Sequence, residues 1–233
     1  MLKFYIEAGK QLFNATTRIA LPNIMLNKAL FFTGYLVTFN PCIVDSAWVF
    51  SHLVVAATYA FTFGTASTMG SLFALSLVAL WAFRLGGFLF FTRVWNKHMD
   101  TRYEPLANII GEKLRHLGVF GQFIFQGLLM SITSLPLYYL FKSPVVFSGS
   151  LMGAKNVVGA GIAVAGIIGQ AIADHQLQDF KNKRKSGEIP KSVSIFREGV
   201  WVKSRHPNLF FELVTWGGFS LMSKNPKILN VRS

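Results

Sequence analysis

The stretch that decides the fold is "TMGSLFALSLVALWAFRLGGFLFFT", which runs from Thr68 to Thr92 and carries a single ionisable side chain, Arg84. A helix needs about 20 consecutive apolar residues to cross the hydrocarbon core of a bilayer. The apolar residues here form one long block rather than short amphipathic periods. The stretch therefore predicts a transmembrane helix and not the surface helix of a soluble domain.

Three more apolar blocks of similar length predict spans at Ser46–Ala66, Val119–Phe141 and Ser150–Ala173. Two shorter pieces, Ala29–Val44 and Leu209–Met222, bring the expectation to about five to six membrane segments. The sequence shows no internal repeat or linker, so we expect a single membrane domain over residues 1–233. The fold class that follows is all-α, a multi-pass transmembrane helical bundle.

The composition and the placement of charge agree with this fold class. Charged residues make up only 14% of the chain, whereas a soluble domain carries about 25%. The net charge is +13, and basic residues concentrate in two polar loops, Arg93–Gly118 and Asp174–His206. Two predicted helices separate these loops, so both lie on one face, which the positive-inside rule makes cytoplasmic. Charge that follows loop topology indicates membrane lipids as partners and argues against nucleic acid.

The residues that commonly bind metals are sparse. The single cysteine, Cys42, rules out a disulfide within the chain and a cysteine-rich zinc site. The five histidines show no HExxH motif or other metal-binding spacing. We therefore expect no metal site.

One polar constellation lies where the block ending at Ala173 becomes a polar loop, in "GQAIADHQLQDFKNKRK" (169–185). At helical spacing Gln170, Asp174, Gln178 and Lys181 share one face. A carboxylate beside a ribose can accept hydrogen bonds from its hydroxyls, and a lysine further along can meet a phosphate. The alternative is a helix that emerges into water with an interfacial Asp and Lys. Spacing alone favours this alternative.

A second constellation lies in "SRHPNLFFELVTWGG" (204–218), where a basic loop becomes an apolar helix. Asn208, Glu212 and Trp216 fall on one face, and a carboxylate inside a membrane normally faces a partner or a water-filled cavity. Arg205 stands beside the free N–H groups of the helix start, which attract anions. The stretch predicts either a phosphate-binding rim above a polar wall or an interfacial anchor with Arg205 and His206 at the lipid headgroups.

Four blocks of this sequence resemble one family of membrane enzymes. They are "LWAFRLGG" (80–87), "DTRY" (100–103), "ADHQL" (173–177) and "SRHPN" (204–208), the last followed by Glu212 and Trp216-Gly217. In order and content they resemble the steroid 5-alpha-reductase C-terminal family, in its DUF1295 branch. That family is related to the isoprenylcysteine methyltransferase-like membrane superfamily. The resemblance covers residues 68–219.

The resemblance implies an integral membrane oxidoreductase that uses NADPH. Its reaction would be the reduction of a C=C bond conjugated to a carbonyl, in a lipophilic substrate such as a steroid or a fatty-acyl compound. By resemblance Asp174 would contact the nucleotide with Gln170 and Lys181 nearby. Asn208 would contact the nicotinamide or ribose, and Glu212 would shape that pocket. Arg205 is the phosphate candidate by the same resemblance, which assigns no catalytic residue.

The chain departs from the family at its carboxy terminus. Family members continue past Trp216-Gly217 with a further helix and a segment that closes the nucleotide site, and this sequence ends at Ser233. We therefore expect a shortened form that lacks the family's C-terminal helix and tail. The membrane would be the endoplasmic reticulum in a eukaryote and the inner membrane in a bacterium.

Two alternatives stay open beside the reductase. One is an S-adenosylmethionine-dependent membrane methyltransferase, which shares the Arg-His-Pro turn, although Asn208 stands where that class usually has a nearby tyrosine. The other is a non-catalytic membrane protein that packs against partners through the row of small residues from Gly161 to Ala173.

Overall fold

The computed structural model describes residues 9–10, 13–97, 114–142, 147–148, 151–190 and 192–223. Among these residues four helices are long and apolar enough to cross a membrane: Ile43–Thr62, Met69–Trp95, Arg115–Thr133 and Ala154–Ser186. This confirms the predicted all-α membrane helical bundle and supports an integral membrane protein. The Asp100–Tyr103 motif lies outside the described residues.

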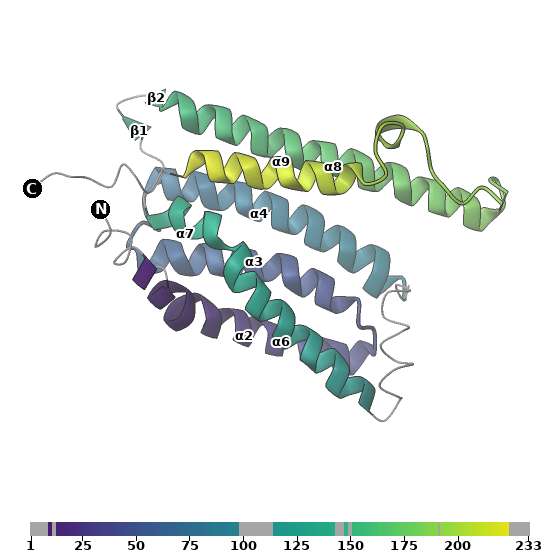
Figure 1. The fold of residues 1–233 in the computed structure, drawn as a ribbon, viewed down its shortest axis with the longest axis horizontal. Helices are drawn as coiled ribbons and strands as arrows, with labels where there is room; N and C mark the ends of the chain where they lie inside the picture. The colour runs from purple at the N-terminus through teal and green to yellow at the C-terminus, as the bar shows by residue number, and fades with distance from the viewer. Residues whose placement is uncertain are drawn as a thin grey trace, which may run out of the picture. The chain divides into compact units, whose positions relative to one another are not determined.

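The chain divides into two compact units, Met1–Phe147 with Ser223–Ser233, and Ser148–Met222. Figure 1 shows the helices of each unit as ribbons. A short ladder of β1 (Phe147–Ser148) and β2 (Leu151–Met152) stands where the chain passes from one unit to the other.

The first unit is a helical bundle built around α3 (Ile43–Thr62). Both α2 (Leu21–Thr38) and α4 (Met69–Leu89) pack against α3, and α6 (Arg115–Thr133) packs against α2 (Figure 1). The turn η1 (Thr16–Ala20) precedes α2 and packs on it. Buried side chains from α2, α3, α6 and their neighbours form one apolar cluster: Tyr35, Cys42, Ile43, Val44, Ala47, Val94, Val119 and Phe123.

The first apolar block, Ala29–Val44, is interrupted at Asn40-Pro41. α2 ends at Thr38, and Phe39 adopts a left-handed conformation with φ of 53°. The Asn40 side-chain oxygen accepts a hydrogen bond from the Cys42 backbone N–H at 3.0 Å, a local turn typical of Asn. The chain can then restart as α3, so the block supplies the end of one helix and the start of another.

Two expected boundaries differ from the structure. The block 119–141 was expected to be one helix, but α6 ends at Thr133 and α7 (Leu135–Lys142) follows. Pro136 explains the break, because a proline has no N–H to donate to the carbonyl one turn earlier, so α6 cannot continue through it. In the other direction, α4 continues directly into the π-helical turn η2 (Phe90–Trp95), which lengthens that span.

The second unit is dominated by two helices, α8 (Ala154–Ser186) and α9 (Pro207–Met222), which lie side by side along much of their length (Figure 1). Their backbones approach closely because both carry glycine at the contact. A Cβ added at Gly218 would lie 2.6 Å from the Gly159 carbonyl oxygen. Small residues at a helix interface permit this approach in membrane proteins.

The expected small-residue face is only half right. Gly169 and Ala173 are buried, but Gly161 and Ala165 are exposed. An i,i+4 row drifts around the helix by about 40° at each step, since a residue advances about 100°. A row of four positions therefore leaves the contact face before it ends. The side of α8 that meets α9 begins instead at Gly159.

Candidate functional site

The candidate site lies at the end of the α8–α9 contact where α9 begins. Pro207 occupies the first turn of α9, a position at which its missing N–H costs nothing. The next residue, Asn208, donates a hydrogen bond from Nδ2 to Oδ1 of Asp174 on α8, at 3.4 Å. Two of the predicted nucleotide-contacting residues, which are 34 positions apart, are thus brought together by the packing of the two helices.

The same place holds two buried acceptor atoms without donors. Gln170 is 4% exposed and lies one turn before Asp174, which is 6% exposed. The Oε1 atom of Gln170 and the Oδ1 atom of Asn208 accept no hydrogen bond from any residue that the structure describes. A buried acceptor without a donor costs about 1–3 kcal/mol. The site therefore favours a ligand that can donate hydrogen bonds.

Glu212 lies one turn after Asn208 on α9 and is half-buried. Its Oε1 atom accepts a hydrogen bond from the indole Nε1–H of Trp216 at 2.8 Å. This bond joins two of the three residues that were predicted to share a face of α9. It fixes the orientation of the Glu212 side chain.

The two predicted phosphate contacts are both exposed cations. Lys181 lies on α8 about two turns beyond Asp174, which is about 10 Å along a helix that rises 1.5 Å per residue. Arg205 lies two residues before the start of α9. Their exposure leaves both side chains able to reach an anion in solvent.

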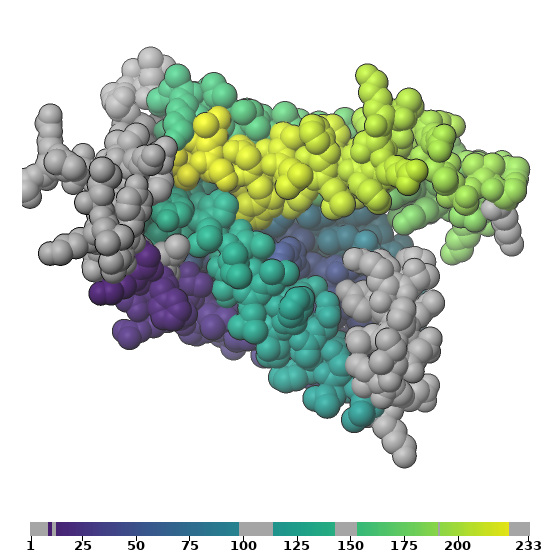
Figure 2. Space-filling model, in the orientation of Figure 1, coloured from purple at the N-terminus to yellow at the C-terminus, as the bar shows by residue number. Residues whose placement is uncertain are grey.

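The structure also shows an attachment that sequence reasoning did not predict. The segment between α8 and α9 is held against α8 on both sides of Asp174. Val200 N–H donates to Oε1 of Gln176 at 3.1 Å, and the indole N–H of Trp201 donates to the carbonyl oxygen of Ala173 at 3.0 Å. In Figure 2 this segment, in yellow-green, lies against the carboxy-terminal part of α8. We call Gln176, Val200 and Trp201 the loop clamp.

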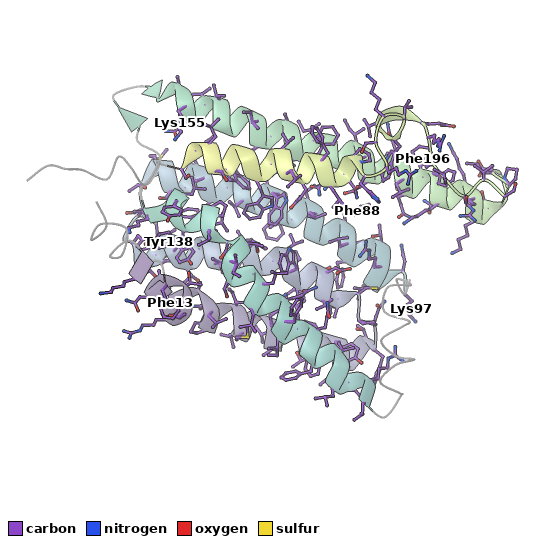
Figure 3. The ribbon with its side chains drawn as sticks, in the orientation of Figure 1. Phe13, Phe88, Lys97, Tyr138, Lys155 and Phe196 are labelled. Carbon is purple, nitrogen blue, oxygen red and sulfur yellow. The ribbon has the colours of Figure 1, made fainter. Side chains whose placement is uncertain are left out.

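Gly199 and a row of aromatic rings complete the attachment. Gly199, the first residue of the short helix η5 (Gly199–Trp201), has φ of 56°, and a Cβ there would collide with the Gln176 amide. Phe196 stacks on Phe180 of α8 with 5.0 Å between ring centroids and approaches Trp201 at 6.2 Å. Figure 3 labels Phe196 on the segment that folds back along α8. The "GVW" motif could have indicated this role through its glycine.

A hollow of about 440 Å³ lies beneath this segment. Its lining comprises Gln176, Asp179, Phe180, Lys183, Glu188, Ile189, Phe196, Glu198 and Gly199. The Lys183 ammonium is ion-paired with Asp179 at 2.9 Å. Because three carboxylates face one lysine, the hollow does not suit a phosphate group. Neither of the predicted phosphate contacts, Lys181 and Arg205, belongs to its lining.

The described residues contain few groupings of the side chains that commonly bind metals. No group of three or more His, Cys, Asp or Glu side chains among them could hold a metal ion. In the first unit, Arg84 is half-buried, and its guanidinium lies 5.9 Å from the centroid of the Phe88 ring.

Comparison with known proteins places the chain in a family. A family model described as "Protein of unknown function (DUF1295)" matches residues 31–230. The chain belongs to the DUF1295 family, and the match extends on both sides of the 68–219 region in which the motifs were noted. No curated protein and no solved structure matches the chain.

Proposed function

We propose that the chain is an integral membrane oxidoreductase that uses NADPH to reduce a C=C bond conjugated to a carbonyl in a lipophilic substrate. The observation that carries the proposal is the set of buried acceptors at the α8–α9 contact. Gln170 Oε1 and Asn208 Oδ1 accept no hydrogen bond from the described residues, and the Asp174 carboxylate lies beside Asn208. The resemblance to the steroid 5-alpha-reductase C-terminal family supplies the reaction class.

The residues present fit such a cofactor. A dinucleotide carries donors at its ribose hydroxyls and at its carboxamide, and these match the buried acceptors. Its phosphates need cations, and the exposed Lys181 and Arg205 flank the acceptors on α8 and before α9. In this proposal Asp174 and Gln170 bind a ribose, and Asn208 binds the carboxamide or the neighbouring ribose.

When bound, the cofactor supplies a hydride. The residues of the chain bind and orient it. Trp216 holds the Glu212 carboxylate in place by a hydrogen bond at 2.8 Å, and Glu212 then shapes the pocket wall. The loop clamp holds the backbone beside Asp174 through Trp201 and Gln176, which limits the freedom of the chain that leads to Asn208. The host membrane would be the endoplasmic reticulum in a eukaryote or the inner membrane in a bacterium.

The test is a titration of the detergent-purified chain with NADPH, followed by nicotinamide fluorescence, with S-adenosylmethionine as competitor. We expect saturable binding that Asp174→Ala weakens by about tenfold or more, since hydrogen bonds to a charged group contribute about 1.5–3 kcal/mol. Asp179→Ala is the matched control, because Asp179 is an exposed carboxylate on the same helix and should leave the affinity unchanged.

Two results would count against the proposal. If S-adenosylmethionine binds and NADPH does not, the methyltransferase hypothesis replaces the reductase proposal. If the folded wild-type chain binds neither compound, the chain is not an enzyme of this class by itself.

A further inference from the structure

The first unit contains a lysine inside its helical bundle. Lys28 stands midway along α2 and is 2% exposed. A charged side chain within a membrane bundle is costly and normally marks a functional site, where it faces a partner or a pathway. The sequence pattern alone assigns no role to Lys28, because the first apolar block was expected to start at Ala29.

Among the described residues, little near Lys28 can neutralise its charge. Its ammonium donates to Oε1 of Gln126 on α6 at 3.3 Å and lies 5.8 Å from the Trp48 ring centroid and 5.9 Å from the Phe123 ring centroid. Lys28 makes no ion pair with the described residues. Asp45 acts on it through space, but that carboxylate is ion-paired with Arg93.

Other polar side chains gather around the same point. The Nδ1 atom of His52 is hydrogen-bonded to the Trp48 carbonyl at 2.9 Å, and its Nε2 atom is hydrogen-bonded to Oγ1 of Thr133 at 3.3 Å. His52 is 1% exposed, and its ring centroid lies 5.2 Å from that of Trp48, the ring that Lys28 approaches. Helices α2, α3 and α6 thus enclose a polar cluster of Lys28, His52, Gln126 and Thr133 within apolar surroundings.

The chemistry of this cluster indicates what it would bind. An ammonium has three donors and no acceptor, and the one hydrogen bond it makes to a described residue goes to a neutral amide. Among the described residues no carboxylate is ion-paired with it, and a charged oxygen acceptor is the partner that an ammonium favours. Gln126 is half-buried, while the apolar side chains of Leu129 and Phe125 beside it are exposed. A ligand that approaches from the bilayer along α6 would therefore meet apolar side chains first and the polar cluster at its end.

We propose that Lys28, with Gln126 and His52, binds the carboxylate or carbonyl oxygen at the polar end of a lipophilic molecule. The binding site lies within the first unit, and the apolar body of the ligand lies against the outer side chains of α6. This inference does not rest on the proposed reductase function, since it involves neither a nucleotide nor any residue of the α8–α9 contact.

The experiment is a binding titration of the purified full chain, measured by native mass spectrometry, with three probes that share one hydrocarbon chain. Oleate presents a carboxylate, methyl oleate presents ester oxygens without the charge, and octadecene presents no oxygen. We expect oleate or methyl oleate to bind in a saturable manner, and whichever binds more tightly identifies the source of the oxygen. Octadecene should bind at least about tenfold more weakly, as the loss of a charge-assisted hydrogen bond predicts.

Variants decide whether the cluster is responsible. Lys28→Met should weaken binding of the preferred probe by about tenfold or more, while Lys10→Met, which changes an exposed lysine, should leave it unchanged. Gln126→Leu alters a half-buried position and should weaken binding severalfold. This variant provides the test if Lys28→Met fails to fold. Equal affinity for octadecene, no saturable binding of any probe, or unchanged binding by folded Lys28→Met or Gln126→Leu would overturn the proposal.

Discussion

A methyl group added at Gly166 tests the packing that creates the candidate site. Gly166 faces α9, and a Cβ built there would lie 2.6 Å from the Thr215 backbone nitrogen and 2.8 Å from the Phe211 carbonyl oxygen. Backbone atoms cannot rotate aside as a flexible side chain can, so the two helices must separate by a few tenths of an ångström or more. Gly166→Ala should therefore destabilise the second unit.

The magnitude follows from two opposing effects. Overpacking of a close contact costs about 1–3 kcal/mol, whereas replacement of a helical glycine by alanine contributes about 1 kcal/mol of propensity. Gly161 lies on the same helix, and a Cβ there meets nothing within 4 Å. Gly161→Ala should therefore gain the propensity without the clash. The free energies of unfolding of the two variants should differ by about 1–3 kcal/mol.

The assay is equilibrium unfolding of the purified chain in mixed micelles with increasing sodium dodecyl sulfate, followed by circular dichroism. Wild type, Gly166→Ala and Gly161→Ala are compared at identical detergent and protein concentrations. If Gly166→Ala is as stable as Gly161→Ala, the close approach of α8 and α9 is not a constraint on this chain. The reasoning that the small residues serve to bring Asp174 and Asn208 together would then be wrong.

Two further predictions concern the loop clamp. Gln176→Leu removes the acceptor for the Val200 N–H, so trypsin should cleave after Arg197 severalfold faster than in the wild type. Gln176→Glu keeps an oxygen acceptor, and this variant should be cleaved at nearly the wild-type rate. Equal cleavage rates for the two variants would contradict the role of the clamp. Trp201→Phe retains an aromatic ring but loses the hydrogen bond to the Ala173 carbonyl. The free energy of unfolding, measured by chemical denaturation, should fall by about 1 kcal/mol. An unchanged midpoint of unfolding would count against that bond.

The sequence predicted the spans well where apolar length alone decides. The blocks from Ser46, Thr68 and Ser150 correspond to α3, α4 and α8. It failed where one local residue opposes the length signal, as at Pro136, which divides 119–141 into α6 and α7. Hydropathy records how apolar a stretch is, and it does not record which residue lacks the N–H that would continue the helix.

The candidate site was predictable in its residues and not in its contacts. Asp174 and Glu212 stand out because carboxylates are rare inside apolar segments, so composition and resemblance were enough to select them. Of the loop clamp and its turn, only Gly199 offered a signal in the sequence, because Gln176 and Trp201 have no unusual chemistry until the segment folds back on α8. Lys28 was missed for a related reason. Its burial depends on α3 and α6, which are distant in sequence.

The two polar clusters differ in the kind of hydrogen-bonding group that lacks a partner among the described residues, acceptors in one and donors in the other. We therefore expect them to bind different ligands. At the α8–α9 contact the buried atoms that receive no hydrogen bond from the described residues are acceptors, Gln170 Oε1 and Asn208 Oδ1, beside the carboxylate of Asp174. They favour a ligand that carries hydrogen-bond donors, such as the ribose hydroxyls of a nucleotide. In the first unit the surplus lies in the donors of the Lys28 ammonium, which call for an oxygen acceptor. A lipid carboxylate should therefore compete poorly with NADPH, and Lys28→Met should leave NADPH affinity unchanged. Loss of NADPH binding in a folded Lys28→Met protein would show that the two clusters are not chemically separate.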